Sequence, residues 1–241
     1  MAKVGNLKEI KGTRNSDRLL VGDRKVAYAL AQNDILESAS DPLLGSMSAS
    51  FLVGGSGNDT YRAGIYGTTV VLENGSSRDN DLLIATGIGI GKQSSFVLDI
   101  DNRHLLAADV NTGQFVLLVD WKKPVNRIER VQLSTGEYSH GEIVSSYRRF
   151  DNYLGNFSWR QLVNEKVLDL NRVGLSPSNV NRAIQKITRR AAKLEKSANM
   201  LSSSASTPGA RTLSNARHPL VPAFSPSESI VALHPLQESH R

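Results

Sequence analysis

The sequence contains no cysteine among its 241 residues, which excludes disulfides and thiolate metal sites. It also has no run near the roughly 20 apolar residues that a membrane helix needs. Its basic first stretch, MAKVGNLKEIKGTRNSDR, lacks the apolar core of a cleaved signal peptide. We therefore expect no membrane span and no cleaved N-terminal signal.

Signatures of common hydrolases are absent as well. The chain has no H-E-x-x-H and no G-x-S-x-G segment, and its five histidines are scattered along the sequence. The sequence thus predicts a protein that is not an enzyme and has no catalytic residue.

Positive charge is scarce in the first part of the chain and abundant in the last. Residues 1–145 hold 15 Lys and Arg against 17 Asp and Glu, and residues 146–241 hold 14 against 6. The net charge of +6 therefore belongs to the C-terminal part, and only there does composition favour an anionic partner.

The composition divides the chain into three segments. Residues 1 to about 145 are rich in Gly, Asp, Asn, Ser and β-branched residues, which predicts a mainly β fold with tight turns. Apolar residues at helical spacing then predict two helices, about 158–173 and 178–201, that form a helical hairpin. The Ser- and Pro-rich end predicts disorder. We place the helical hairpin at 147–201 and the tail at 202–241, after the β-rich part.

The stretch FLVGGSGNDTYRAG, residues 51–64, is the most informative motif. It has no lysine, and an aspartate follows its glycines, so it does not fit a phosphate-binding loop. Residues 54–62 instead fit the nonapeptide G-G-x-G-x-D-x-U-x of calcium-binding parallel β-helices, in which U is a large apolar residue. Gly54, Gly55 and Gly57 permit the tight turn, and Asp59 offers the hard oxygen that Ca²⁺ prefers.

Neighbouring segments keep part of the nine-residue period. Leu43, Leu52 and Tyr61 fall at position U and are expected to face the core, and Asp41 takes the aspartate position. Two nonapeptides make one winding of about 18 residues in such a coil, so Asp41 and Asp59, 18 apart, are predicted to share one Ca²⁺.

Two further Asn-Asp pairs stand near this motif. Asn33-Asp34 with Leu36 lies out of register with the nine-residue frame, whereas Asn80-Asp81 with Leu83 repeats the spacing of Asn58-Asp59 with Tyr61. Asp81 is therefore a candidate for a weaker calcium site. The alternative for all these segments is a set of Gly- and Asn-rich turns that bind nothing.

These residues resemble the hemolysin-type calcium-binding repeat (RTX) family. GNDTYRAGIYGTTVVLENG is followed by NDLLIATGIGIG and by a segment with Trp121, Asn126-Arg127-Ile128-Glu129 and Gly136, an order similar to the hemolysin-type calcium-binding related domain. The resemblance implies a short parallel β-roll over 12–64 and a β-rich hairpin domain over 65–145. It also implies calcium-triggered folding outside the cell after export by type I machinery through an uncleaved C-terminal signal.

The basic helix at 178–200 leaves a second reading open. Its apolar stripe is expected to pack on helix 158–173 with its charges in solvent, although the same stripe also suits self-association. The alternative to the calcium-binding interpretation is a cytoplasmic, helix-mediated interaction or nucleic-acid-binding protein whose β part is a scaffold. Membrane binding through the basic residues is a further alternative.

Overall fold

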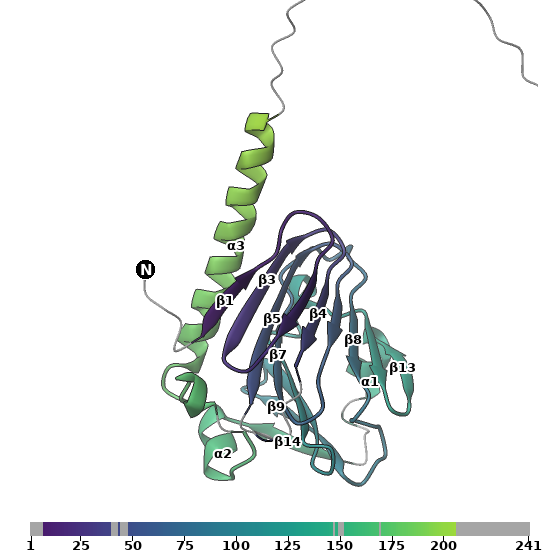
Figure 1. Ribbon diagram of the computed structural model, residues 1–241. Helices are drawn as coiled ribbons and strands as arrows, with labels where there is room; N and C mark the ends of the chain where they lie inside the picture. The colour runs from purple at the N-terminus through teal and green to yellow at the C-terminus, as the bar shows by residue number, and fades with distance from the viewer. Residues whose placement is uncertain are drawn as a thin grey trace, which may run out of the picture. The chain divides into compact units, whose positions relative to one another are not determined.

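The computed structural model describes residues 7–39, 43, 48–146, 148, 152–168 and 170–205. This part of the chain is mainly β, as predicted, with two mixed and largely parallel sheets and a C-terminal helix (Figure 1). Sheet A has the order β1-β3-β5-β7-β11-β10-β9-β14, and sheet B has the order β13-β12-β8-β6-β4-β2.

The strands of sheet A are β1 (Lys8–Lys11), β3 (Lys25–Ala31), β5 (Ala49–Ser56), β7 (Gly67–Leu72), β9 (Ser95–Ile100), β10 (His104–Asp109), β11 (Gln114–Leu118) and β14 (Tyr153–Phe157). The strands of sheet B are β2 (Arg18–Val21), β4 (Ile35–Ser38), β6 (Thr60–Arg62), β8 (Leu82–Ala85), β12 (Arg130–Leu133) and β13 (Gly136–Ser139).

Up to β8, successive strands alternate between the two sheets. Each strand pairs in parallel with the strand two places later, so β4 lies beside β6 and β6 beside β8. The register places Arg18 opposite Ile35, Ile35 opposite Thr60, and Thr60 opposite Leu82. The windings therefore take 17, 25 and 22 residues, which differs from the predicted constant 18 because links of different length join the strands.

The expectation that Leu43 faces the core is wrong, because this side chain is 93 % exposed. Leu52 and Tyr61 are fully buried, as the nonapeptide predicts. Leu43 lies in the link between β4 and β5, outside both sheets, so the nine-residue period does not extend back to it.

After β8 the chain continues both sheets by hairpins. Strands β9, β10 and β11 are antiparallel neighbours, and β11 joins sheet A beside β7 in parallel. The hairpin β12–β13 extends sheet B beyond β8. The apolar runs between residues 95 and 133 thus form β9, β10, β11 and β12, and β10 and β11 are joined by a turn in which Gly113 has a φ of 63°.

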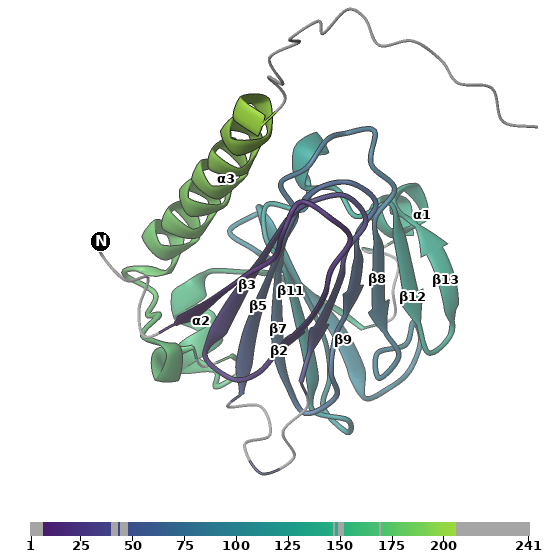
Figure 2. The ribbon, with the colours of Figure 1, turned by 45° about the horizontal axis from the view of Figure 1, so that its top comes forward.

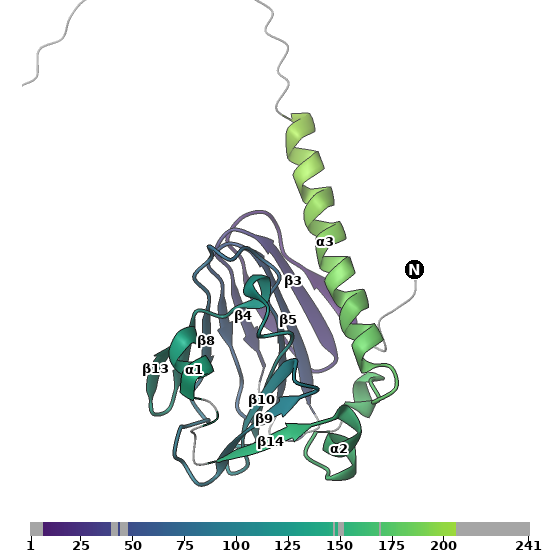
Figure 3. The ribbon, with the colours of Figure 1, turned by 180° about the vertical axis from the view of Figure 1, so that it is seen from behind.

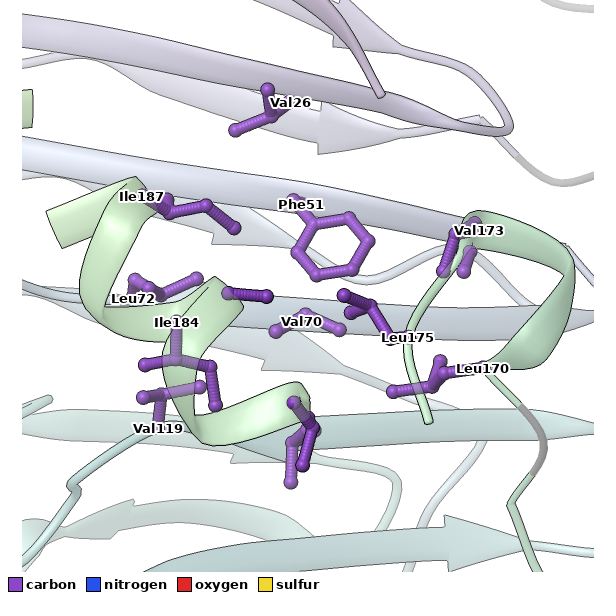
Figure 4. Packing of buried hydrophobic residues seen from close by; sticks show 14 of the residues in the cluster. Val26, Phe51, Val70, Leu72, Val119, Leu170, Val173, Leu175, Ile184 and Ile187 are labelled. Atoms are coloured by element: carbon purple, nitrogen blue, oxygen red, sulfur yellow. The ribbon is translucent and has the colours of Figure 1, made fainter. Parts of the chain in front are cut away.

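Two hydrophobic clusters hold these layers together. One lies between the sheets and includes Leu36, Leu52, Tyr61 and Leu83, and Figure 2 shows the two sheets as separate layers. The other lies on the opposite face of sheet A, where Phe51 and other strand residues meet the C-terminal helical segments (Figure 4). Sheet A is thus covered on both faces, as expected for parallel strands.

The helices differ from the predicted hairpin in length and packing. Besides α1 (His140–Ser146), the chain forms α2 (Trp159–Asn164) and α3 (Val180–Ala205), with 3₁₀ turns at Pro124–Asn126 and Asn171–Val173. Helix α2 ends well before residue 173, because Lys166 takes a left-handed φ of 55°. Figure 3 shows α1, α2 and α3 from the other side.

Helix α3 carries the predicted apolar stripe, but it packs mainly on sheet A. Val180, Ile184, Ile187 and Ala191 are buried in the outer cluster with residues of β3, β5 and β7. Burying this stripe against the sheet leaves the polar face of the helix in solvent. No helix within the described residues is long and apolar enough to cross a membrane. The predicted disordered tail, 202–241, begins too early, because α3 continues to Ala205. Its other residues, 206–241, lie outside the described residues, and their disorder stays a prediction.

Candidate metal centre

The three Asn-Asp pairs stand at equivalent corners of the fold. Each pair directly precedes a strand of sheet B: Asn33-Asp34 before β4, Asn58-Asp59 before β6 and Asn80-Asp81 before β8. The strands pair in parallel, with Ile35 opposite Thr60 and Thr60 opposite Leu82, so the three aspartates form one column at the N-terminal ends of these strands.

The column is joined by hydrogen bonds from main chain to carboxylate. The amide N–H of Asp34 donates to Oδ1 of Asp59 at 2.8 Å, and that of Asp59 donates to Oδ1 of Asp81 at 2.7 Å. The same contact continues at both ends, from Asp17 to Asp34 at 2.7 Å and from Asp81 to Oε2 of Glu129 at 2.9 Å. Each carboxylate therefore fixes the winding that precedes it.

The asparagines form a second column with the opposite direction. The amide N–H of Asn58 donates to Oδ1 of Asn33 at 2.9 Å, and the amide of Asn80 donates to Oδ1 of Asn58 at 2.8 Å. The Asn-Asp dipeptide thus satisfies main-chain donors in both neighbouring windings, which explains why the pair repeats at this corner.

Two aspartates of the column and a glutamate from outside it bring three carboxylates together. Asp59, Glu73 and Asp81 each offer an oxygen, and these oxygens lie within 4.8 Å of one another. Glu73 directly follows β7, so it reaches the cluster from sheet A, whereas the aspartates belong to sheet B. All three residues are buried, with exposures of 1 to 3 %.

The cluster contains a phenol and an unpartnered oxygen. The hydroxyl of the fully buried Tyr61 donates to Oε2 of Glu73. Oε1 of Glu73 accepts the amides of Asn74 and Gly75 at 2.7 and 2.6 Å. Oδ2 of Asp59 is buried and accepts no hydrogen bond, a condition that costs free energy unless a proton or cation compensates it.

Gly54 forms the wall of this cluster. A Cβ atom at Gly54 would lie 1.9 Å from the Tyr61 hydroxyl oxygen, 2.6 Å from Oε2 of Glu73 and 2.7 Å from Oδ2 of Asp59. These three oxygens therefore surround one point beside the main chain of β5. Only glycine permits such an approach.

Gly55 and Gly57 serve packing between windings. Their φ values are 152° and 130°, and a Cβ at either position would lie 2.1 Å from the carbonyl oxygen of Leu30 or Gln32, respectively, in the preceding winding. Both positions therefore require glycine, as predicted. The group that excludes a side chain there is the main chain of the preceding winding.

The electrostatic environment of the cluster is strongly acidic. Burial, reinforced by the charges of Asp34, Asp81 and Asp79, raises the pKa of Asp59 to about 8. Burial and the charge of Glu129 raise the pKa of Asp81 to about 7. Burial, followed by the charge of Asp81, holds the pKa of Glu73 well above its usual range. Such a group of carboxylates requires protons or a cation.

No protein-family model matches the chain, and no curated protein matches it. The interpretation of the cluster therefore depends on its own residues and geometry.

The structure brings together part of the predicted site. Asp59 and Asp81 are neighbours in the column, and Gly54 contacts their cluster. Asp41 lies outside the described residues, so its role stays a prediction; the residues of the column on either side of Asp59 are Asp34 and Asp81.

Sequence reasoning missed Glu73 and the place of Asp34. Glu73 stands at the end of the apolar run of β7, directly before Asn74-Gly75, and a carboxylate at that position of a turn was the available signal. Asp34 was placed out of register because the nonapeptide frame assumes windings of equal length.

The donor set fits a calcium ion. Ca²⁺ takes hard oxygen ligands at 2.3–2.6 Å, so two ligands of one ion stand at most about 5.2 Å apart. The 4.8 Å spread of the three carboxylate oxygens satisfies this limit. Asp59, Glu73 and Asp81 would hold the ion, with the Tyr61 hydroxyl beside them, and its charge would offset theirs.

Proposed function

We propose that this protein is a non-enzymatic, calcium-binding β-roll protein of the RTX type, in which Ca²⁺ links successive windings. The observation that carries the proposal is the buried group of Asp59, Glu73 and Asp81 with an unpartnered Oδ2 on Asp59. The alternation of parallel strands between two sheets supports the roll.

A cation explains this group better than a set of structural hydrogen bonds. Buried carboxylates in native proteins are usually paired with a cationic side chain or neutralised. In the described part of the chain, none of the ion pairs includes any of the three carboxylates. Acidic groups supply the charges that act on them, so only protons or a bound cation lower the repulsion.

Calcium binding would then be coupled to folding. Glu73 follows a strand of sheet A and the aspartates precede strands of sheet B, and the site exists only when two successive windings are stacked. An ion that binds the native state alone stabilises it in proportion to its occupancy. We propose that this coupling operates outside the cell after type I export, where calcium is abundant.

The test is thermal unfolding and calorimetric calcium titration of the wild type and of Asp59→Asn. At a calcium concentration near 100 times the dissociation constant, one site adds about 2.7 kcal/mol, or roughly 5–11 °C in a domain of this size. The wild type should show this rise relative to chelator. Asp59→Asn keeps the Oδ1 acceptor for Asp34 and removes the charge, so it should lose both the rise and the heat of binding.

Asp101→Asn serves as the matched control. Asp101 is exposed in the turn between β9 and β10, and asparagine tolerates its positive φ of 52°. This variant should keep the full calcium response. Equal melting temperatures of the wild type in calcium and in chelator, with no heat of binding, would exclude the proposal.

A further inference from the structure

Helix α3 presents a straight row of cations to solvent. Arg182, Lys186, Arg189, Lys193 and Lys196 are all exposed and follow one another at steps of 4, 3, 4 and 3 residues. This spacing places them on one face of the helix. From Arg182 to Lys196 the row extends about 21 Å at 1.5 Å per residue.

The row is weakly compensated by acidic groups. Glu195 is the single acidic residue in α3, and the helix has six basic residues. One of the six, Arg190, lies outside the row and pairs with Glu9 of β1 at 2.9 Å. The remaining five keep their charge on a surface that also projects beyond the end of β1 and β3 (Figures 1 and 3).

The buried face of α3 decides which anionic partner suits the row. A helix that lies in a membrane surface inserts its apolar face among the lipids. In α3 that face is occupied, because Ile184 and Ile187 point into the cluster with Phe51, Val70 and Leu72 (Figure 4). Only the charged face remains accessible, which suits a rigid polyanion that is contacted through its charges alone.

We infer that the row formed by Arg182, Lys186, Arg189, Lys193 and Lys196 binds the phosphate backbone of double-stranded DNA without reading its sequence. The wide major groove of B-form DNA admits an exposed helix, and phosphate contacts by Lys and Arg provide affinity without base recognition. Helix α3 has no aromatic residue, so stacking on single-stranded bases is not available to it. The calcium site is not involved, since α3 packs on the outer face of sheet A.

The experiment measures binding of a random 20-base-pair duplex to the full chain by fluorescence anisotropy at several NaCl concentrations. Five phosphate contacts predict a slope of log K against log [NaCl] of about −4.5, or roughly 500-fold weaker binding at 200 mM than at 50 mM salt. The variant Lys186→Gln/Arg189→Gln/Lys193→Gln removes three exposed contacts. It should reduce the magnitude of the slope by about 2.7.

A charge-matched variant separates the row from net charge. Arg62→Gln/Arg78→Gln/Arg160→Gln also removes three exposed cations, from sheet B, a turn and α2, and should keep the wild-type slope. The inference is overturned if both variants weaken binding equally, if the first keeps the wild-type slope, or if the wild type binds anionic vesicles but not the duplex. Circular dichroism melts of both variants confirm that the fold is intact.

Discussion

The carboxylate of Asp81 accepts a hydrogen bond from the main-chain N–H of Asp59 at 2.7 Å. The same carboxylate also lies in one buried cluster with the carboxylate of Asp59. One contact stabilises the stacking of two windings, and the other opposes it through repulsion of like charges. The two residues are therefore held together by the backbone in a place where their charges repel. This conflict makes the corner sensitive to protons, cations and small changes of shape.

Substitution of Gly54 should abolish calcium binding even though it removes no ligand. The Cβ of Gly54→Ala would stand within 2.7 Å of oxygens on Tyr61, Glu73 and Asp59, a separation that forces the side chains apart. Calorimetry should detect no calcium heat, and the melting temperature in chelator should fall. Gly91→Ala is the control for a glycine change, since nothing lies within 4 Å of a Cβ at Gly91, although its φ of 71° costs some strain. Gly91→Ala should keep the calcium response.

The stability of the calcium-free protein should decrease as pH rises. Asp34, Asp59 and Asp81 have pKa values raised from 3.8 to about 6, 8 and 7. The native state therefore holds protons that the unfolded chain has released, and their contribution is complete below pH 4, falls as pH rises above 4, and is lost once pH exceeds 8. In chelator, the melting temperature should fall by several degrees between pH 5.5 and pH 8.5.

Saturating calcium should remove most of this decrease, because the ion replaces the protons. Asp59→Asn offers the control in chelator, since an amide cannot lose a proton in this range. Its melting temperature should vary less with pH and should match or exceed that of the wild type at pH 8. A wild type whose stability in chelator rises over this range would contradict the raised pKa values.

The sequence predicted the fold better than it predicted the site. The mainly β character of residues 1 to about 145 and the apolar stripe of α3 follow from local patterns, and the structure confirms them. Local patterns are enough to predict these elements, because the spacing of the apolar residues within each segment decides which of its faces is buried.

The site needed information that no local pattern contains. Glu73 joins Asp59 only because β7 and β6 belong to different sheets whose ends meet at one corner. Asp34 is the neighbour of Asp59 in the column because this winding takes 25 residues. The lengths of the links between strands decide which aspartates stack, and a fixed repeat length misplaced them.

Gln32 marks a corner at which a glycine should improve stability. Its φ is 72°, and this left-handed conformation costs a non-glycine residue about 1–2 kcal/mol. Gln32 is exposed, and Gly57 occupies the neighbouring corner of the next winding. Gln32→Gly should raise the free energy of unfolding by about 0.5–1 kcal/mol after the entropy cost of glycine. Denaturant unfolding measures the gain, and a loss of stability would show that the Gln32 side chain makes a compensating contact.

The packing of α3 on sheet A should be a major part of the stability of the fold. Ile187 is fully buried and lies beside Phe51 and Leu72 in the outer cluster (Figure 4). Ile187→Ala leaves a cavity in that cluster and should cost about 2–5 kcal/mol in urea unfolding. The neighbouring Lys186→Ala, at an exposed position on the same helix, should change the free energy of unfolding by less than about 0.5 kcal/mol. Equal effects of the two variants would mean that α3 does not dock on the sheet in solution. The same comparison with calcium present should give the same difference, because the proposed calcium site lies at the opposite face of sheet A.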